Sequence, residues 1–148
     1  MNGWWRYMRS LSRSAARYVS KLSNKIRRRI DALSSKRELS GAQGKALHFI
    51  LAQTGDVFQK DIEEEYGLRP PTASELLKKM ERNGLIRRES LPEDARMKRI
   101  LVCEKALCYK ESVITDLTEL EEELLRGVSE EDLEVFFRVM EQMMKNIS

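Results

Sequence analysis

The sequence IRRESLPEDARMKRILV occupies residues 86–102 and directly follows PTASELLKKMERNGL at residues 71–85. Residues 71–85 have apolar residues at helical spacing, and residues 86–102 have two strand-like runs on either side of a turn. The predicted hairpin is basic, with Arg87, Arg88, Arg96, Lys98 and Arg99. A basic hairpin beside an exposed helix suits a grip on duplex DNA at two places. Phosphates would supply most of the affinity, and base edges the sequence preference.

Length and charge limit the alternatives. The 148 residues are 41% hydrophobic and 34% charged, which favours one globular domain or two small parts that fold as a unit. The net charge of +3 is uneven: residues 1–40 carry about +9 and residues 111–148 about −8. Opposite charges at the two ends suggest that the termini lie near one another, within a chain or across a dimer. Two solvated helix faces explain the same pattern equally well.

The sequence contains no run of about eighteen apolar residues, so no membrane span is expected. Residues 1–10 lack the apolar core and cleavage site of a secretory signal. Residues 1–30 contain no acid, as in a transit peptide or a membrane-surface helix. Against that reading, the apolar stripe continues to Leu33. Cys103 and Cys108 do not form a disulfide framework, so a reducing cytoplasm is the simplest location.

Apolar periodicity and capping residues predict six helices. The first helix is expected at about Trp5–Ser35, and the second runs from Ser40, in a capping box with Gln43, to Thr54. The third is short, contains Phe58, Ile62 and Tyr66, and is closed by Gly67; the fourth runs from Pro71 or Thr72 to Asn83-Gly84. The fifth is expected at about Glu104–Arg126, and the last is capped by Ser129. Leu47, Ile50 and Leu51 are expected to point inward from the second helix.

The first and last helices are long and amphipathic, and the central part that they could cover is small. Such helices commonly pack on a partner chain, so we expect a homodimer. The predicted organisation is an N-terminal dimerisation helix at residues 1–38, a DNA-binding domain at 39–102, and C-terminal dimerisation helices at 103–148. Aromatic and methionine side chains are expected to form the C-terminal seam: Phe136, Phe137, Met140, Met144 and Ile147.

Residues 57–84 fit two short helices joined by a tight turn, with the second helix exposed. Its N-terminal residues would enter the major groove, and its start at Pro71 and Thr72 leaves backbone N–H groups of the first turn, beginning with that of Thr72, for a phosphate. Glu75 repels phosphate, although it could accept from cytosine; a pair with Lys78 or Lys79 one turn on is slightly favoured.

The chain resembles the MarR family of winged helix–turn–helix regulators from about Leu11 to the C-terminus. PEDARMKRILV, residues 92–102, carries the most specific part of the resemblance. It implies that Asp94 orients Arg96, which reaches into the minor groove and reads its width. The sequence departs from the family after the hairpin, where Val102-Cys103-Glu104-Lys105-Ala106 replaces the usual Leu-Thr and glycine.

A surface turn with a local ion pair would also explain Asp94 and Arg96, but their place after a helix–turn–helix favours DNA contact. The residues expected to bind DNA are Gln59, Pro71, Thr72, Ser74, Glu75, Lys78, Lys79, Arg82, Asp94, Arg96, Lys98 and Arg99.

Other chemistry finds little support in the sequence. His48 is the only histidine, so one chain cannot assemble a histidine-based catalytic or zinc cluster, and His48 is expected in or beside the core. No phosphate-binding loop, nucleophile elbow or carboxylate dyad is visible, and the acidic run 119–123 is typical of a solvated helix face. We therefore expect no enzyme, no metal and no cofactor.

The sequence predicts a mainly α, winged helix–turn–helix homodimer that acts as a transcription regulator, most simply a repressor, on nucleoid DNA in the cytoplasm. The family resemblance adds a pocket for small aromatic or phenolic effectors. Two alternatives stay open: redox sensing through Cys103 or Cys108, which a lysine or Arg88 nearby would favour, and a winged-helix module that binds protein instead of DNA.

Overall fold

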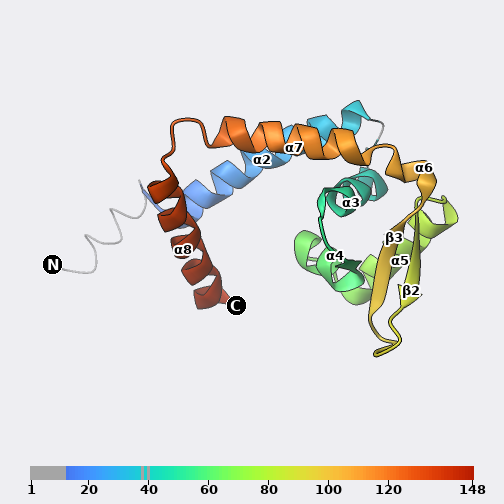
Figure 1. The fold of residues 1–148 in the computed structure, drawn as a ribbon. Helices are drawn as coiled ribbons and strands as arrows, with labels where there is room; N and C mark the ends of the chain where they lie inside the picture. The colour runs from blue at the N-terminus through green and yellow to red at the C-terminus, as the bar shows by residue number, and fades with distance from the viewer. Residues whose placement is uncertain (1–12, 38, 40) are drawn as a thin grey trace. The chain divides into compact units, whose positions relative to one another are not determined.

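The computed structural model describes residues 13–37, 39 and 41–148 (Figure 1). The chain divides into two compact units, of which the first ends at Thr115 and the second covers Asp116–Ser148. The predicted mainly helical fold with a small basic hairpin is confirmed.

The first described helix, α2, covers Ala15–Lys36. Ser14 precedes it in an extended conformation, and the Ser14 hydroxyl accepts a hydrogen bond from the backbone N–H of Arg17. The prediction of one continuous helix from Trp5 is therefore wrong at its start, because Ser14 is the N-cap of α2 and the helix begins only after it. The part of that prediction that falls on residues 1–12 lies outside the described residues. Near its C-terminal end, α2 is tied to the next helix by an ion pair between Asp31 and Lys45 at 3.4 Å.

Helix α3, Gly41–Ala52, supplies much of the core of the first unit. Leu47, Ile50 and Leu51 are buried, as their spacing predicted. The helix ends before the Thr54-Gly55-Asp56 turn, also as predicted. The predicted capping role of Ser40 lies outside the described residues.

Helices α4, Gln59–Tyr66, and α5, Pro70–Arg82, form the helix–turn–helix. Gly67 closes α4 with φ +61°, a left-handed cap that glycine adopts without strain. Phe58 was predicted inside this helix but precedes it as the N-cap, with its backbone N–H donating to the Asp61 carboxylate at 2.8 Å. Helix α5 begins one residue earlier than predicted, because Pro70 also fits a first turn.

Strands β2, Ile86–Ser90, and β3, Lys98–Val102, form the predicted hairpin, which we call the wing. Together with β1, Val57–Phe58, they make an antiparallel sheet in the order β1-β3-β2. The sequence did not predict β1, because two residues are too few to show a strand period. Val57 and Arg88 both pair with Ile100 of β3, which fixes the register of the sheet.

After the wing the chain forms two helices where one was predicted: α6, Glu104–Leu107, and α7, Lys110–Leu124. The N–H groups of Ala106 and Tyr109 donate to carbonyls three residues back, at Cys103 and Ala106. This tighter turn breaks the α-helical ladder at Cys108 and Tyr109. The backbone N–H of Cys103 donates to the Leu85 carbonyl at 3.0 Å, so the start of α6 is tied to the beginning of the wing.

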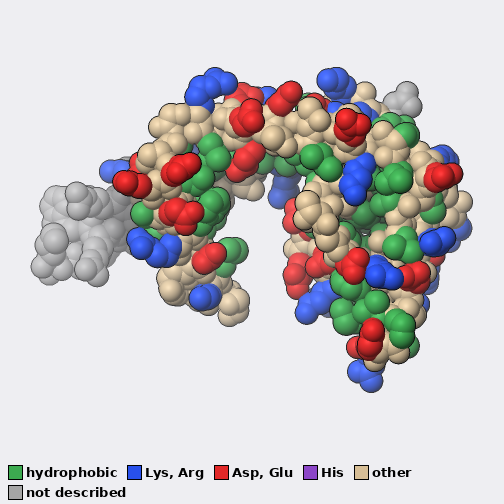
Figure 2. Space-filling model, in the orientation of Figure 1, with side chains coloured by type: hydrophobic (Ala, Val, Ile, Leu, Met, Phe, Trp, Pro, Cys, Tyr) green, Lys and Arg blue, Asp and Glu red, His purple; other side chains and the backbone are tan. Residues whose placement is uncertain are grey.

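The second unit contains the last helix, α8, Glu130–Ile147. The Ser129 hydroxyl accepts from the backbone N–H of Asp132 at 3.1 Å, which confirms the predicted cap. None of the side chains of α8 is buried, and Figure 2 shows hydrophobic side chains at the surface in this part of the chain. Across the described ranges, no helix is both long and apolar enough to cross a membrane.

Candidate nucleic-acid interface

Helix α5 has one buried face and one exposed face, as the sequence predicted. Ala73, Leu77 and Met80 are completely buried against the rest of the first unit. On the other face, Ser74 is half-buried, and the following predicted site residues are exposed: Pro71, Thr72, Glu75, Lys78, Lys79 and Arg82. The packing of the apolar face therefore leaves a polar, mainly cationic helix surface open to solvent.

Glu75 does not pair with Lys78 or Lys79, the partners that the sequence favoured. Its carboxylate lies 3.7 Å from the Arg82 guanidinium, and both side chains are more than half exposed. An exposed pair of this kind contributes little to stability. Among the described residues, Lys78 and Lys79 lie within ion-pair distance of no carboxylate, so both ammonium groups are available to an anionic partner.

The tip of the wing is ordered by Asp94. Its carboxylate accepts a hydrogen bond from the backbone N–H of Arg96 at 2.9 Å, and its carbonyl accepts from the N–H of Met97 at 3.1 Å. Aspartate commonly builds a tight turn by bonding the backbone two residues on. The carboxylate thus sets the backbone at Arg96 without binding its guanidinium.

The Arg96 side chain is exposed, and no carboxylate of a described residue lies within ion-pair distance of its guanidinium. Figure 2 shows a Lys or Arg side chain beside an acidic one at the tip of the wing. Lys98, at the start of β3, is also exposed. Arg96 and Lys98 therefore form no ion pair within the described part of the chain, although Glu93 and Asp94 of the same turn balance their formal charge.

Arg99 has a different environment from the other predicted site residues. Its guanidinium donates to the carboxylate of Glu89, its neighbour across the hairpin, and to Asp56 at 3.4 Å. The hydrogen bond and the charge of Glu89 raise the pKa of Arg99 further above its usual value. Arg99 therefore ties the turn between α3 and β1 to both strands of the wing, and these contacts leave less of its guanidinium for a ligand.

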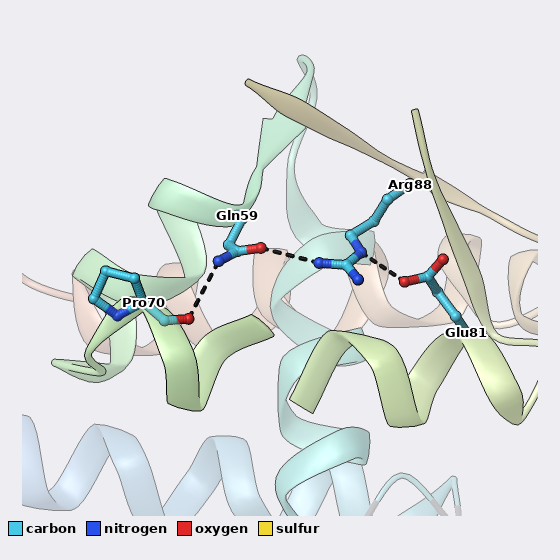
Figure 3. Close-up of polar contacts among 4 residues, drawn as sticks. All are labelled: Gln59, Pro70, Glu81 and Arg88. Carbon is cyan, nitrogen blue, oxygen red and sulfur yellow. Dashed lines mark hydrogen bonds and ion pairs between the residues drawn. The ribbon is translucent and has the colours of Figure 1, made fainter. Parts of the chain in front are cut away.

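Arg88 faces the interior, although the sequence placed it among the basic residues of the hairpin. Its Nε donates to Glu81 at 2.6 Å, its Nη1 donates to the side-chain oxygen of Gln59 at 3.1 Å, and its side chain is only 10% exposed (Figure 3). The Gln59 amide then donates to the carbonyl of Pro70 at 3.3 Å. The predicted site residue Gln59 therefore already has protein partners for both ends of its amide. Strand periodicity is the signal that could have identified Arg88, because it shares a face with the buried Ile86.

Arg69 is a further exposed cation beside this surface, and it was not among the residues predicted to bind DNA. It is the exposed N-cap of α5 and stands in an extended conformation beside the exposed helix face. A cation at a helix N-terminus gains nothing from the helix dipole, whereas a phosphate bound there would interact with both. Its position just before the two prolines was the available signal.

The remaining titratable groups do not form a further site among the described residues. His48 is buried, as predicted, and burial followed by the charge of Arg37 lowers its pKa. Cys103 is half-buried and Cys108 is exposed, with the Cys108 thiol 3.5 Å from the Lys105 carbonyl. The described residues contain no group of three or more histidine, cysteine or acidic side chains arranged to hold a metal ion.

The sequence and the fold of this chain were compared with those of known proteins. Residues 38–97 match a family model described as MarR family. MepR of S. aureus in a DNA-binding conformation is 24% identical, with a TM-score of 0.76 over 91% of this chain and 99% of that chain. The S. aureus MepR–DNA complex is 24% identical, with a TM-score of 0.69 over 90% and 98%. The transcription regulator MarR from Oenococcus oeni PSU-1 is 23% identical, with a TM-score of 0.70 over 88% and 98%.

These solved structures share the fold of this chain, and the matched segment contains the helix–turn–helix and the tip of the wing. Over residues 38–97 the chain is therefore similar to the MarR family, whose model that segment matches, and the described fold is that of these solved winged-helix proteins.

Proposed function

We propose that this chain binds duplex DNA as a sequence-selective transcription regulator and is not an enzyme. Helix α5 would enter a major groove and the wing an adjacent minor groove. The single observation that carries the proposal is the combination of an exposed cationic face on α5 with an exposed Arg96 at the wing tip, whose guanidinium forms no ion pair with a described carboxylate. The match of residues 38–97 to the MarR family model supports it, and structures that share the fold are described as transcription regulators, one of them in complex with DNA.

Each predicted residue except Gln59 has a part in this proposal, and Arg69 joins them. Thr72, Ser74 and Lys78 lie on the N-terminal half of α5, where side chains reach base edges. The other groups would contact phosphates or hold the wing in place: Arg69 and the backbone N–H of Thr72 at the helix start, where Pro71 sets the first turn but has no N–H to donate, Lys79 and Arg82 along the helix, and Asp94, Lys98 and Arg99 in the wing. Arg96 would enter the minor groove and read its width. Glu75, paired with Arg82, would discourage binding to sites that bring a phosphate close to it.

We propose that the active form is a homodimer. Helix α8 exposes an apolar surface that includes Phe136, Phe137, Met144 and Ile147, and a second copy of the chain would bury it. The excess of positive charge in residues 1–40 and of negative charge in residues 111–148 would add attraction between such copies. Two-fold symmetry predicts a pseudo-palindromic site with half-sites about 10 base pairs apart.

Repression follows from the same geometry, because a dimer seated on nucleoid DNA excludes other proteins from that site. A small aromatic or phenolic effector would release it by favouring a separation of the two α5 helices that no longer matches the groove spacing. An effector of this kind must bind the two separations with different affinity, since equal affinity shifts nothing.

The test begins with selection of bound duplexes from a random pool, followed by titration of the best duplex at several salt concentrations. The expected outcome is an enriched pseudo-palindrome whose affinity falls steeply with salt, because each neutralised phosphate releases counterions. Sedimentation of the complex should give two chains per duplex. A chain that enriches no sequence and ignores duplex DNA even at low salt would contradict the proposal and favour a protein-binding module.

A further inference from the structure

We infer that Arg88 and Gln59 are positioning residues that lock the wing to the N-terminus of α5, so that the helix and the wing engage DNA as one rigid unit. This inference rests on the proposed function and assigns it two residues that do not themselves touch DNA. Gln59 thereby loses the direct contact expected from the sequence and gains a role in orienting α5.

The contacts form a continuous path across three elements (Figure 3). Glu81 near the end of α5 accepts from Arg88 of β2, Arg88 donates to Gln59 at the start of α4, and Gln59 donates to the carbonyl of Pro70, the first residue of α5. The path thus leaves α5 near its C-terminal end and returns to it at its N-terminal end. Both ends of α5 are therefore connected by hydrogen bonds to Arg88 of β2, the C-terminal end directly and the N-terminal end through Gln59.

The chemistry of this path suits positioning. The guanidinium is planar and donates in two fixed directions, so its carboxylate and amide partners must keep a defined angle. The Arg88 side chain is almost fully buried, whereas Glu81 is one-third exposed. An interior arginine that satisfies two elements at once loses one partner if either element shifts. The wing and the helix therefore move together or not at all.

Register supports the same assignment. Arg88 pairs with Ile100 in the hairpin, and the face that they share also carries the buried Ile86. The proposed DNA contacts on the wing are at its far end, at Arg96 and Lys98. A small rotation at Arg88 is carried along the strands to the tip, where it becomes a larger displacement of Arg96 relative to α5.

Two substitutions that leave the charge unchanged test the path. Arg88→Lys keeps an ion pair with Glu81 but cannot reproduce the planar fork that also reaches Gln59. Gln59→Met keeps the length of the side chain and removes both hydrogen bonds. Arg87→Lys is the matched control, because Arg87 is the exposed neighbour on the same strand and lies outside the proposed contacts.

Each variant is measured in two ways with the full chain. In duplex titrations, Arg88→Lys and Gln59→Met should each lower affinity by about tenfold, and the double variant by little more than either single one, because one path is broken once. The slope of affinity against salt should stay at the wild-type value, because no phosphate contact is removed. Arg87→Lys should stay within about twofold of wild type.

Without DNA, amide chemical shifts give an independent reading. Both variants should move the signals of Thr72 and Ala73 in the first turn of α5, far along the path from Arg88, and Arg87→Lys should not. If Arg88→Lys proves unstable, Gln59→Met tests the same hydrogen bonds, because Gln59 is only half-buried and its substitution disturbs the core less.

The outcomes separate the two claims. Variants that bind as wild type, or that lose about one unit of salt slope as a direct phosphate contact would, overturn the positioning role while the proposed function stands. Unmoved Thr72 and Ala73 signals in both variants also overturn it. A wild-type chain that binds no duplex overturns the proposed function, and the positioning role with it.

Discussion

The carboxylate of Asp94 accepts a hydrogen bond from the backbone N–H of Arg96, with an oxygen-to-nitrogen distance of 2.9 Å. The aspartate therefore controls the arginine through the turn that carries it, and not through a guanidinium–carboxylate pair. This arrangement leaves every guanidinium donor of Arg96 free of described carboxylates. It also places a negative charge close to where a phosphate backbone would run.

Asp94→Ala and Asp94→Asn separate the turn from the charge. Both variants remove the negative charge, but only asparagine keeps an oxygen that accepts from the Arg96 N–H. We expect the alanine variant to bind duplex DNA about two- to tenfold more weakly than the asparagine variant, the value of one hydrogen bond. Fluorescence anisotropy on a selected duplex measures this ratio. Equal affinities of the two variants would show that the turn does not matter for binding.

Arg96→Ala should weaken binding and reduce the salt slope by about one unit or less. Arg96→Lys keeps the charge but loses the planar guanidinium, so its slope should stay near the wild-type value. Its preference for duplexes with a narrow minor groove beside the half-site should fall. Titration of duplexes that differ only in that flanking sequence tests this preference. An unchanged affinity and slope for Arg96→Ala would reject the wing assignment.

Sequence periodicity predicted the elements that carry the proposed site, and it did so for physical reasons. The apolar spacing of α5, the Asn83-Gly84 stop and the basic hairpin are local signals, each readable within about fifteen residues. Gly67 was also predictable, because a left-handed cap favours glycine. These features do not require knowledge of what the segment packs against.

The features that the sequence did not predict depend on partners distant in the chain. Strand alternation could have assigned Arg88 to the buried face, but its partner Gln59 lies 29 residues away and no local pattern points to that contact. Arg99 finds Asp56 across 43 residues, so its engagement in the sheet was equally hidden. The break between α6 and α7 arises where the chain leaves the wing, a junction at which apolar periodicity continues unchanged.

Gly44 of α3 lies so close to the chain before it that a larger residue cannot fit. A Cβ added at Gly44 would lie 2.0 Å from the Leu39 carbonyl carbon, a backbone atom that cannot turn aside. Gly44→Ala should therefore destabilise the fold by about 1–3 kcal/mol, in spite of the higher helix propensity of alanine. Urea unfolding measures the change. Gly55→Ala is the control, because a Cβ there meets nothing within 4 Å, and it should shift stability by less than about 1 kcal/mol.

Phe136 lies on the exposed apolar surface of α8. If a second copy buries that surface, Phe136→Asp should place a charge in the seam and raise the dimer dissociation constant by about a hundredfold or more. Sedimentation equilibrium measures the constant. Glu141→Ala, at an exposed carboxylate of the same helix, should leave it within about threefold. A Phe136→Asp variant that remains fully dimeric would place the interface elsewhere.

His48 makes stability depend on pH. The side chain is 3% exposed, and its Nε2 has no hydrogen-bond partner among the described residues. Burial and the charge of Arg37 lower its pKa below the ordinary 6.5, so the unfolded chain binds a proton more readily than the folded chain. The free energy of unfolding should be level above pH 6.5 and fall as the pH drops below it. Urea titrations at a series of pH values test this dependence. His48→Leu should remove it, because His48 is the only histidine; a variant that keeps the same decline would assign it to the carboxylates.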